Sequence, residues 1–152
     1  MKRLFVVALV MSAVYLPALA QKNRGDDFPD LIKRYYSAWN TLKPNNVSSM
    51  YAKDADLVFF DIAPLKYNGW QEYRDTFEKN VAPGFASLTL TPNNDVKVTR
   101  GGNLALATLT FHLSGKEKNG SALEFDCRHT IVWQKRGGRW LIIHEHVSKP
   151  LF

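Results

Sequence analysis

A chain of 152 residues with 45% hydrophobic and 12% aromatic residues is long enough to bury one sizeable core, so we expect a single domain. Its formal net charge of +6 comes from scattered Lys and Arg residues, whereas nucleic-acid binders concentrate such residues on one face, which argues against a nucleic-acid partner. The single cysteine, Cys127, excludes an internal disulfide, and its apolar strand neighbours indicate a buried, inert thiol.

The first 20 residues have the three parts of a cleaved export signal. Lys2 and Arg3 form a positive start, residues 4–16 are almost entirely apolar, and residues 18–20 (Ala-Leu-Ala) offer the small side chains that a signal peptidase recognises. The apolar run is shorter than the roughly 20 residues that span a bilayer, which favours a removed signal over a membrane anchor. We therefore expect an exported protein, periplasmic or secreted, that does not stay in the membrane.

Cleavage after Ala20 leaves 18 basic residues against 14 acidic ones, a net charge of +4. Residues 21–26 are polar, and we expect them to be disordered. The folded domain is expected over residues 27–150, since no linker, repeat or second apolar span divides this part of the chain.

Three helices are expected at the start of the domain. Asp27 can cap the first, whose aromatic and aliphatic residues keep helical spacing until it ends near Thr41. Residues 45–51 should form a short second helix, capped by asparagine. Residues 69–79 should form a third, amphipathic helix, which Pro83-Gly84 ends.

Strands make up most of the rest. The apolar run of residues 57–60 predicts a buried strand. Period-two alternation then predicts strands over residues 86–100 (interrupted near 92–94), 104–114, 121–135 and 139–148. Helices followed by antiparallel hairpins indicate an α+β fold with helices on one face of the sheet.

The last two strands carry unusual polar residues. Strict alternation places His144 and His146 on one face of the last strand with Trp140, and Arg128 and Thr130 on one face of the strand before it. Burying a polar group without a partner costs roughly 2–7 kcal/mol, so these side chains imply partners, a wet cavity or a ligand. Because both faces of both strands are largely apolar, we expect helices to cover one face and a second subunit the other.

The end of the chain resembles a known family. Residues 128–133 contain Arg-x-Thr in a strand, a Gly-containing turn precedes Trp140, and residues 143–150 contain His-x-His-x-Ser followed by Pro. This pattern is similar to the end of SnoaL-like domains of the nuclear-transport-factor-2-like superfamily. Within it, the pattern resembles the association domain of calcium/calmodulin-dependent kinase II and its bacterial relatives. The order of elements upstream agrees, so the resemblance covers about residues 27–150.

The resemblance implies a cone-shaped fold, in which three N-terminal helices pack in a strongly curved mixed or antiparallel sheet with an internal pocket. It places four polar residues inside that pocket and three aromatic residues as ligand-binding walls: Arg128, Thr130, His144 and His146, with Tyr36, Trp39 and Phe60. It also implies a homodimer through the outer sheet face and no obligatory metal or cofactor.

Arg128 suggests the charge of the ligand. A guanidinium holds a carboxylate with two parallel hydrogen bonds, so Arg128 in a pocket favours a small anionic ligand. A structural ion pair with Asp126, Glu124 or Glu145 explains Arg128 equally well.

Acid–base catalysis is the alternative. Enzymes of this superfamily such as ketosteroid isomerase use a pocket Asp or His, and the candidates here are Asp61 as base and His144 or His146 as acid–base. Tyr36 and Tyr67 are the candidate hydrogen-bond donors. An Asp directly after an apolar strand also commonly ends that strand through a turn.

His144 and His146 lie about 7 Å apart at Cα, a spacing that some metal sites use. A third ligand would have to be His112 or Asp61, whose placement the sequence does not define, and hydrogen-bonded neutral imidazoles explain the pair, so we expect no metal. The sequence thus favours an exported homodimer that binds a small organic, anionic ligand. A cofactor-free isomerase or lyase is the second hypothesis, and a structural oligomerisation domain is the third.

Overall fold

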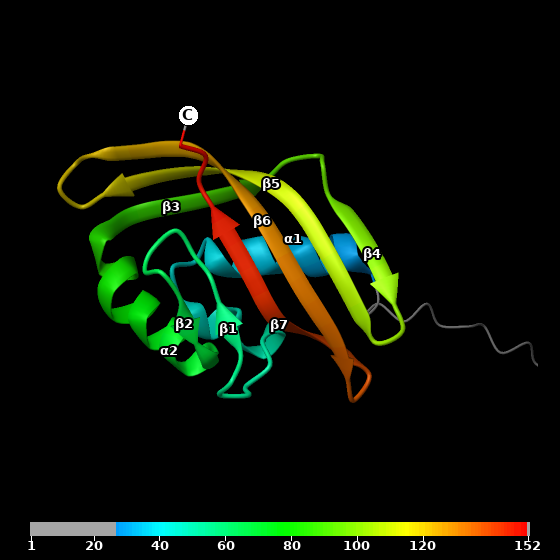
Figure 1. The fold of residues 1–152 in the computed structure, drawn as a ribbon. Coiled ribbons are helices and arrows are strands. Elements are labelled where there is room, and N and C mark those ends of the chain that lie inside the picture. Colours follow the sequence, from blue (N-terminus) through cyan, green and yellow to red (C-terminus); the bar gives the residue numbers. More distant parts are fainter. Residues whose placement is uncertain (1–26, 152) are drawn as a thin grey trace, which may run out of the picture.

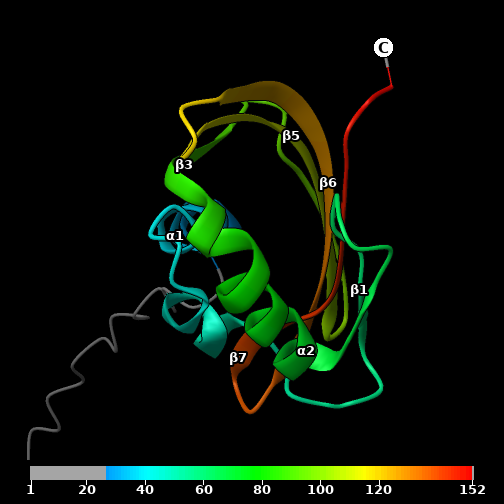
Figure 2. The same cartoon turned by 90° about the vertical axis from the view of Figure 1, so that its left-hand side faces the viewer.

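The computed structural model describes residues 27–151, so the expected export signal and the polar segment 21–26 lie outside the described residues. Helix α1 (Phe28–Trp39) and helix α2 (Gly69–Thr76) accompany a five-stranded antiparallel sheet (Figure 1). Figure 2 shows both helices on the same side of the sheet, which bends toward them. The expected α+β class is confirmed. Among the described residues, no helix combines the length and apolarity needed to cross a bilayer.

Helix α1 forms because its apolar residues recur every three or four positions. Pro29 sits in the first turn, where a backbone N–H has no helical partner in any case. One stripe of the helix is buried: Phe28, Leu31, Ile32, Tyr35, Tyr36 and Trp39. This stripe faces the sheet and brings four aromatic side chains to the interior.

The prediction of a short second helix over residues 45–51 is wrong. Two 3-10 turns take its place, η2 (Pro44–Asn46) and η3 (Ser48–Met50). A segment this short cannot offset the cost of nucleating an α-helix. The backbone N–H of Ala52 instead donates to the carbonyl of Ile142 (2.9 Å), which draws the segment onto the sheet. The described residues therefore contain two α-helices rather than three.

A small hairpin precedes α2. Strands β1 (Val58–Phe59) and β2 (Tyr67–Asn68) pair antiparallel, so the predicted strand is present but short. Gly69 opens α2 with φ +73°, a conformation that glycine adopts without strain. The helix continues as a π-helical turn, η4 (Phe77–Val81), and a 3-10 turn, η5 (Ala82–Gly84).

The sheet contains β3 (Phe85–Pro92), β4 (Lys97–Gly101), β5 (Leu104–Glu117), β6 (Ala122–Arg136) and β7 (Arg139–Ser148). Its neighbours run β3-β5-β6-β7, and β4 pairs with the other half of β5. Strands β3 and β4 are thus two halves of one edge, as expected from the interruption near residues 92–94.

Strand β7 contains one extra residue. Its register with β6 passes from the pair Val132–His144 to the pair Trp133–Ile142, which leaves Ile143 as a β-bulge. A bulge reverses the face to which the following side chains point. Consequently Glu145 and Val147 are buried with Trp140 and Ile142, whereas His146 is exposed. The expectation that His144 and His146 share a face with Trp140 is therefore wrong.

The outer sheet face carries exposed apolar side chains. Leu104 and Leu106 of β5 are 42% and 41% exposed, and Leu106 lies opposite Val132 of β6. Exposed apolar residues of this kind suit a subunit contact. The homodimer through this face stays a prediction.

Candidate functional site

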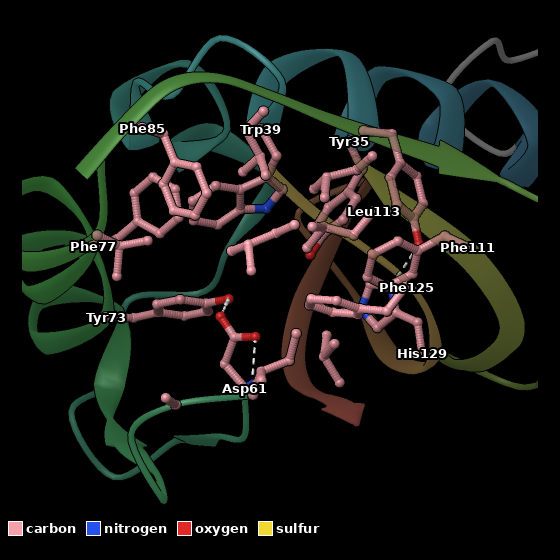
Figure 3. Close-up of a pocket in the computed structure, with 18 residues that line it drawn as sticks. Tyr35, Trp39, Asp61, Tyr73, Phe77, Phe85, Phe111, Leu113, Phe125 and His129 are labelled. Carbon is pink, nitrogen blue, oxygen red and sulfur yellow. Dashed lines mark hydrogen bonds between the residues drawn. The ribbon is translucent and has the colours of Figure 1, made fainter. Parts of the chain in front are cut away.

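A cavity of about 270 Å³ lies between the two helices and the inner face of the sheet (Figure 3). Aromatic side chains reach it from α1 (Tyr35, Tyr36, Trp39), from α2 and η4 (Tyr73, Phe77) and from the sheet (Phe85, Phe111, Phe125). Eight aliphatic residues complete the wall, together with Asp61 and His129. The cavity is therefore apolar with a few polar groups, the usual composition of a small-molecule site.

The structure separates the residues that the sequence placed in one pocket. Tyr36, Trp39 and Asp61 line the cavity. Six others do not: Phe60, Tyr67, Arg128, Thr130, His144 and His146. The placement of these six in the cavity wall is wrong, whereas no observation tests their proposed roles.

The reason lies in the faces of the last two strands. On β6, Arg128 and Thr130 alternate with Cys127, His129 and Ile131, and it is the second set that is buried. On β7, the bulge turns both expected histidines away from the interior. Burial raises the pKa of the Cys127 thiol to about 11, as suits an unreactive interior thiol.

The displaced residues have other contacts. The Phe60 ring lies between the rings of His144 and His146, with centroids 5.4 and 5.6 Å away. Nδ1 of His144 shares a hydrogen bond with the carbonyl of Val58 (2.7 Å), so its proton lies on Nδ1. Within residues 27–151, no group of three or more His, Cys, Asp or Glu side chains is arranged to hold a metal ion.

Tyr67 supports the cavity wall from behind. Its ring stacks on Tyr73 with centroids 4.3 Å apart, and its hydroxyl donates to the carbonyl of Ala63 (3.0 Å). Tyr67 thereby fixes the ring of Tyr73, which does reach the cavity.

Asp61 is positioned by a backbone bridge to β7. The N–H of Phe60 donates to the carbonyl of Glu145 (2.9 Å), and the N–H of Val147 donates to the carbonyl of Phe60 (3.0 Å). This bridge ends one residue before Asp61, whose carboxylate points into the cavity (Figure 3). One oxygen accepts from the backbone N–H of Ile62 (2.7 Å) and the other from the Tyr73 hydroxyl (2.9 Å).

The surroundings raise the pKa of Asp61 above its ordinary value. Burial is the largest cause, because it disfavours the charged form, and the negative charge of Glu145 acts in the same direction. The hydrogen bonds from Ile62 and Tyr73 and the nearby His129 act in the opposite direction. A carboxyl with a raised pKa inside a cavity is a typical feature of functional sites.

A polar network lies at the inner end of the cavity. Glu145 is 0% exposed and accepts hydrogen bonds from the hydroxyls of Tyr35 (3.0 Å) and Tyr51 (2.8 Å). Nδ1 of His129 shares a hydrogen bond with the Tyr36 hydroxyl (2.9 Å). The other ring nitrogen, Nε2, makes no hydrogen bond and lies 3.7 Å from Glu145.

The candidate site residues predicted from the sequence include neither His129 nor Glu145, so most of this network was missed. A signal was present, because His129 alternates with Cys127, Ile131 and Trp133 on the more apolar face of β6. A lone polar residue on such a face has to meet an interior partner or a ligand. Glu145 carries a similar signal, because plain alternation places it with the apolar Leu141, Ile143 and Val147, but its partners lie 110 and 94 residues away in the sequence.

The Asp61→Asn variant should be more stable than the wild type at neutral pH. With a raised pKa, the folded protein binds the proton of Asp61 more tightly than the unfolded chain does. The stability that protonated Asp61 contributes to the wild type is therefore lost as the pH rises through the folded pKa. Asparagine cannot ionise, so we expect a Tm gain of a few degrees at pH 7 that vanishes toward pH 3.8, the ordinary value.

Thermal unfolding between pH 3 and pH 8 tests this expectation. Asp56→Asn is the matched control, because Asp56 is exposed and its replacement removes the same charge from the protein. An equal Tm change in both variants would show that net charge, and not the cavity, is responsible.

The comparisons agree with the resemblance seen in the sequence. A model of the SnoaL-like domain family matches residues 29–151. A nuclear transport factor 2-like superfamily protein from Salmonella enterica subsp. enterica serovar Typhimurium str. LT2 is similar in structure, with a TM-score of 0.76 and 21% identity. That match covers 82% of this chain and 89% of that one. No protein with a curated description matches the sequence.

Two further solved structures share the fold. A calcium/calmodulin-dependent protein kinase II association domain-like protein from Xanthomonas campestris has a TM-score of 0.69 and 23% identity, covering 82% of this chain and 86% of that one. A hexachlorocyclohexane dehydrochlorinase has a TM-score of 0.71 and 12% identity, covering 82% and 84%. At these identities the likeness concerns the fold alone.

Proposed function

Since the chain belongs to the SnoaL-like domain family, we propose that its interior cavity binds a small organic molecule with a largely apolar body. The carrying observation is the cavity of about 270 Å³, whose wall is aromatic and aliphatic except for Asp61 and His129. Protein interiors are close-packed, so an apolar cavity of this size does not stabilise the fold. Its presence is better explained by a bound ligand. We further propose that this binding takes place outside the cytoplasm.

The proposal differs from the sequence-based expectation in the charge of the ligand. The preference for an anion depended on Arg128 in the pocket, and Arg128 lies on the outer face of β6. Among the described residues, no lysine or arginine lines the cavity. An anionic ligand therefore loses its support.

Filling the cavity should abolish binding. Leu113 projects into it from β5, and Leu113→Trp places an indole in the space that the ligand needs. We expect the affinity for 2-phenylethanol, an apolar alcohol used as probe, to fall at least about tenfold, as measured by isothermal titration calorimetry.

Ser114→Trp is the matched control, because Ser114 is the next residue of β5 and is exposed. It should bind the probe as the wild type does. Overpacking costs about 1–3 kcal/mol, so the Tm of both variants is measured to verify folding. Unchanged binding in a folded Leu113→Trp variant would contradict the proposal.

A second candidate function is favoured by the position of Asp61. A carboxylate that points into a cavity, with His129 in the same wall, can remove or return a proton on a bound carbonyl compound. This is the cofactor-free isomerase or lyase hypothesis, with Asp61 as the base.

A further inference from the structure

We infer that the cavity selects a positively charged ligand, a small lipophilic amine, with the Asp61 carboxylate as its counter-ion. This inference rests on the proposed function, because it names the chemical class of the ligand that the cavity binds. Its first support is the set of ionisable groups in the wall, which comprises Asp61, His129 and three tyrosines. Asp61 takes part in none of the ion pairs between described residues.

The carboxylate of Asp61 has unused hydrogen-bonding capacity. Each oxygen accepts one hydrogen bond, from the N–H of Ile62 and from the hydroxyl of Tyr73. An ionised carboxylate offers about four lone-pair sites, so two remain for donors from a ligand. An ammonium group offers such donors together with the opposite charge, and charge-assisted hydrogen bonds are the stronger kind.

A second carboxylate strengthens the negative potential in the cavity. Glu145 lies behind the inner wall, and its charge helps to raise the pKa values of Asp61, Tyr36 and Tyr73, all of which line the cavity. The same field stabilises a cation and repels an anion.

The aromatic wall suits a cation as well. Tyr73 lies beside the carboxylate of Asp61 in Figure 3, and Trp39, Phe125 and further aromatic rings line the same cavity. The negative faces of aromatic rings attract cations, which is how aromatic cages recognise ammonium ligands. The wall can therefore hold the apolar body of an amine and part of its charge together.

A matched ligand series tests the inference. The three probes share a phenyl group on a short chain and differ in charge: 2-phenylethylamine (cation), 2-phenylethanol (neutral) and phenylacetate (anion). Titration calorimetry at pH 7 and low salt should give an affinity for the amine at least about tenfold above that for the alcohol, with phenylacetate weakest. Leu113→Trp should weaken the binding of the amine and the alcohol alike, which locates both in the cavity.

The Asp61→Asn variant assigns the preference to one residue. It should lower the affinity for the amine by about tenfold and leave the affinity for the alcohol within about threefold. Asp56→Asn removes an equal charge from an exposed site and should leave the amine affinity unchanged. If Asp61→Asn does not fold, the ranking of the three affinities for the wild type still decides whether the cavity prefers a cation.

The outcomes separate the two proposals. An alcohol or phenylacetate that binds as tightly as the amine overturns the cation preference and leaves the binding cavity in place. Equal amine binding by the wild type and Asp61→Asn overturns the role of Asp61. If none of the three probes binds, the cation preference and the proposed function both fail.

Discussion

Replacing Glu145 by alanine should lower the free energy of unfolding by about 3–5 kcal/mol. The carboxylate is fully buried and accepts the hydroxyl hydrogen bonds of Tyr35 and Tyr51. Burial and the charge of Glu145 raise the pKa values of both tyrosines well above their usual range, so these hydroxyls remain protonated donors. The variant leaves two buried donors unpaired and an empty space, and each of these destabilises the folded state.

Urea denaturation followed by circular dichroism measures the loss. Glu145→Gln keeps the volume and one acceptor oxygen, so its loss should be smaller than that of the alanine variant. Glu78→Ala is the surface control, because Glu78 is exposed on η4, and it should stay within about 0.5 kcal/mol of the wild type. A loss below about 1 kcal/mol in Glu145→Ala would show that the network contributes little to stability.

The parts of the fold that depend on neighbouring residues could be predicted from the sequence. The buried stripe of α1 follows from helical spacing between Phe28 and Trp39, and the faces of β6 follow from plain alternation. The helix expected over residues 45–51 failed for a local reason as well, because a segment of this length gains too few hydrogen bonds to remain an α-helix.

The faces of β7 could not be predicted in this way. Ile143 is apolar and β-branched, so it is as suited to a regular strand as to a bulge. Its extra place arises from the register with β6, and that register depends on pairing across the sheet. One inserted residue moved two histidines outward and Glu145 inward, which changed the candidate site.

The candidate site was predicted in part for the same reason. Tyr36 and Trp39 reach the cavity from α1, whose buried stripe follows from helical spacing, whereas Asp61 is held there by the backbone bridge between Phe60 and β7. The prediction that Arg128 lies in the pocket failed, because alternation tells which residues share a face but not which face is inside. That choice depends on the helices, which pack against the side of the sheet that carries His129 and Ile131.

If Asp61 is a catalytic base, Asp61→Asn should slow proton removal from a bound carbonyl compound by about 10²- to 10⁴-fold, the usual contribution of such a group. The reason is positional, because the carboxylate points into the cavity and its raised pKa makes it a stronger base than an exposed aspartate. The reaction to follow is exchange of the α-hydrogens of cyclohexanone for deuterium in D₂O, observed by proton NMR. The affinity for 2-phenylethanol should stay within about threefold, since an amide has nearly the volume of a carboxylate.

The variants His144→Gln and His146→Gln are the matched controls, because both residues are acid–base candidates by sequence and lie outside the cavity wall. Their exchange rates should equal that of the wild type. Exchange that persists in Asp61→Asn, or that disappears in His146→Gln, would remove Asp61 from the role of base. If the wild type does not exceed the buffer rate, this carbonyl chemistry is excluded for cyclohexanone, and the binding function keeps its own test through Leu113→Trp. The discriminating quantity is thus the ratio of the exchange rate to the binding affinity in one variant, because the loss of a base lowers the exchange rate and leaves the affinity constant.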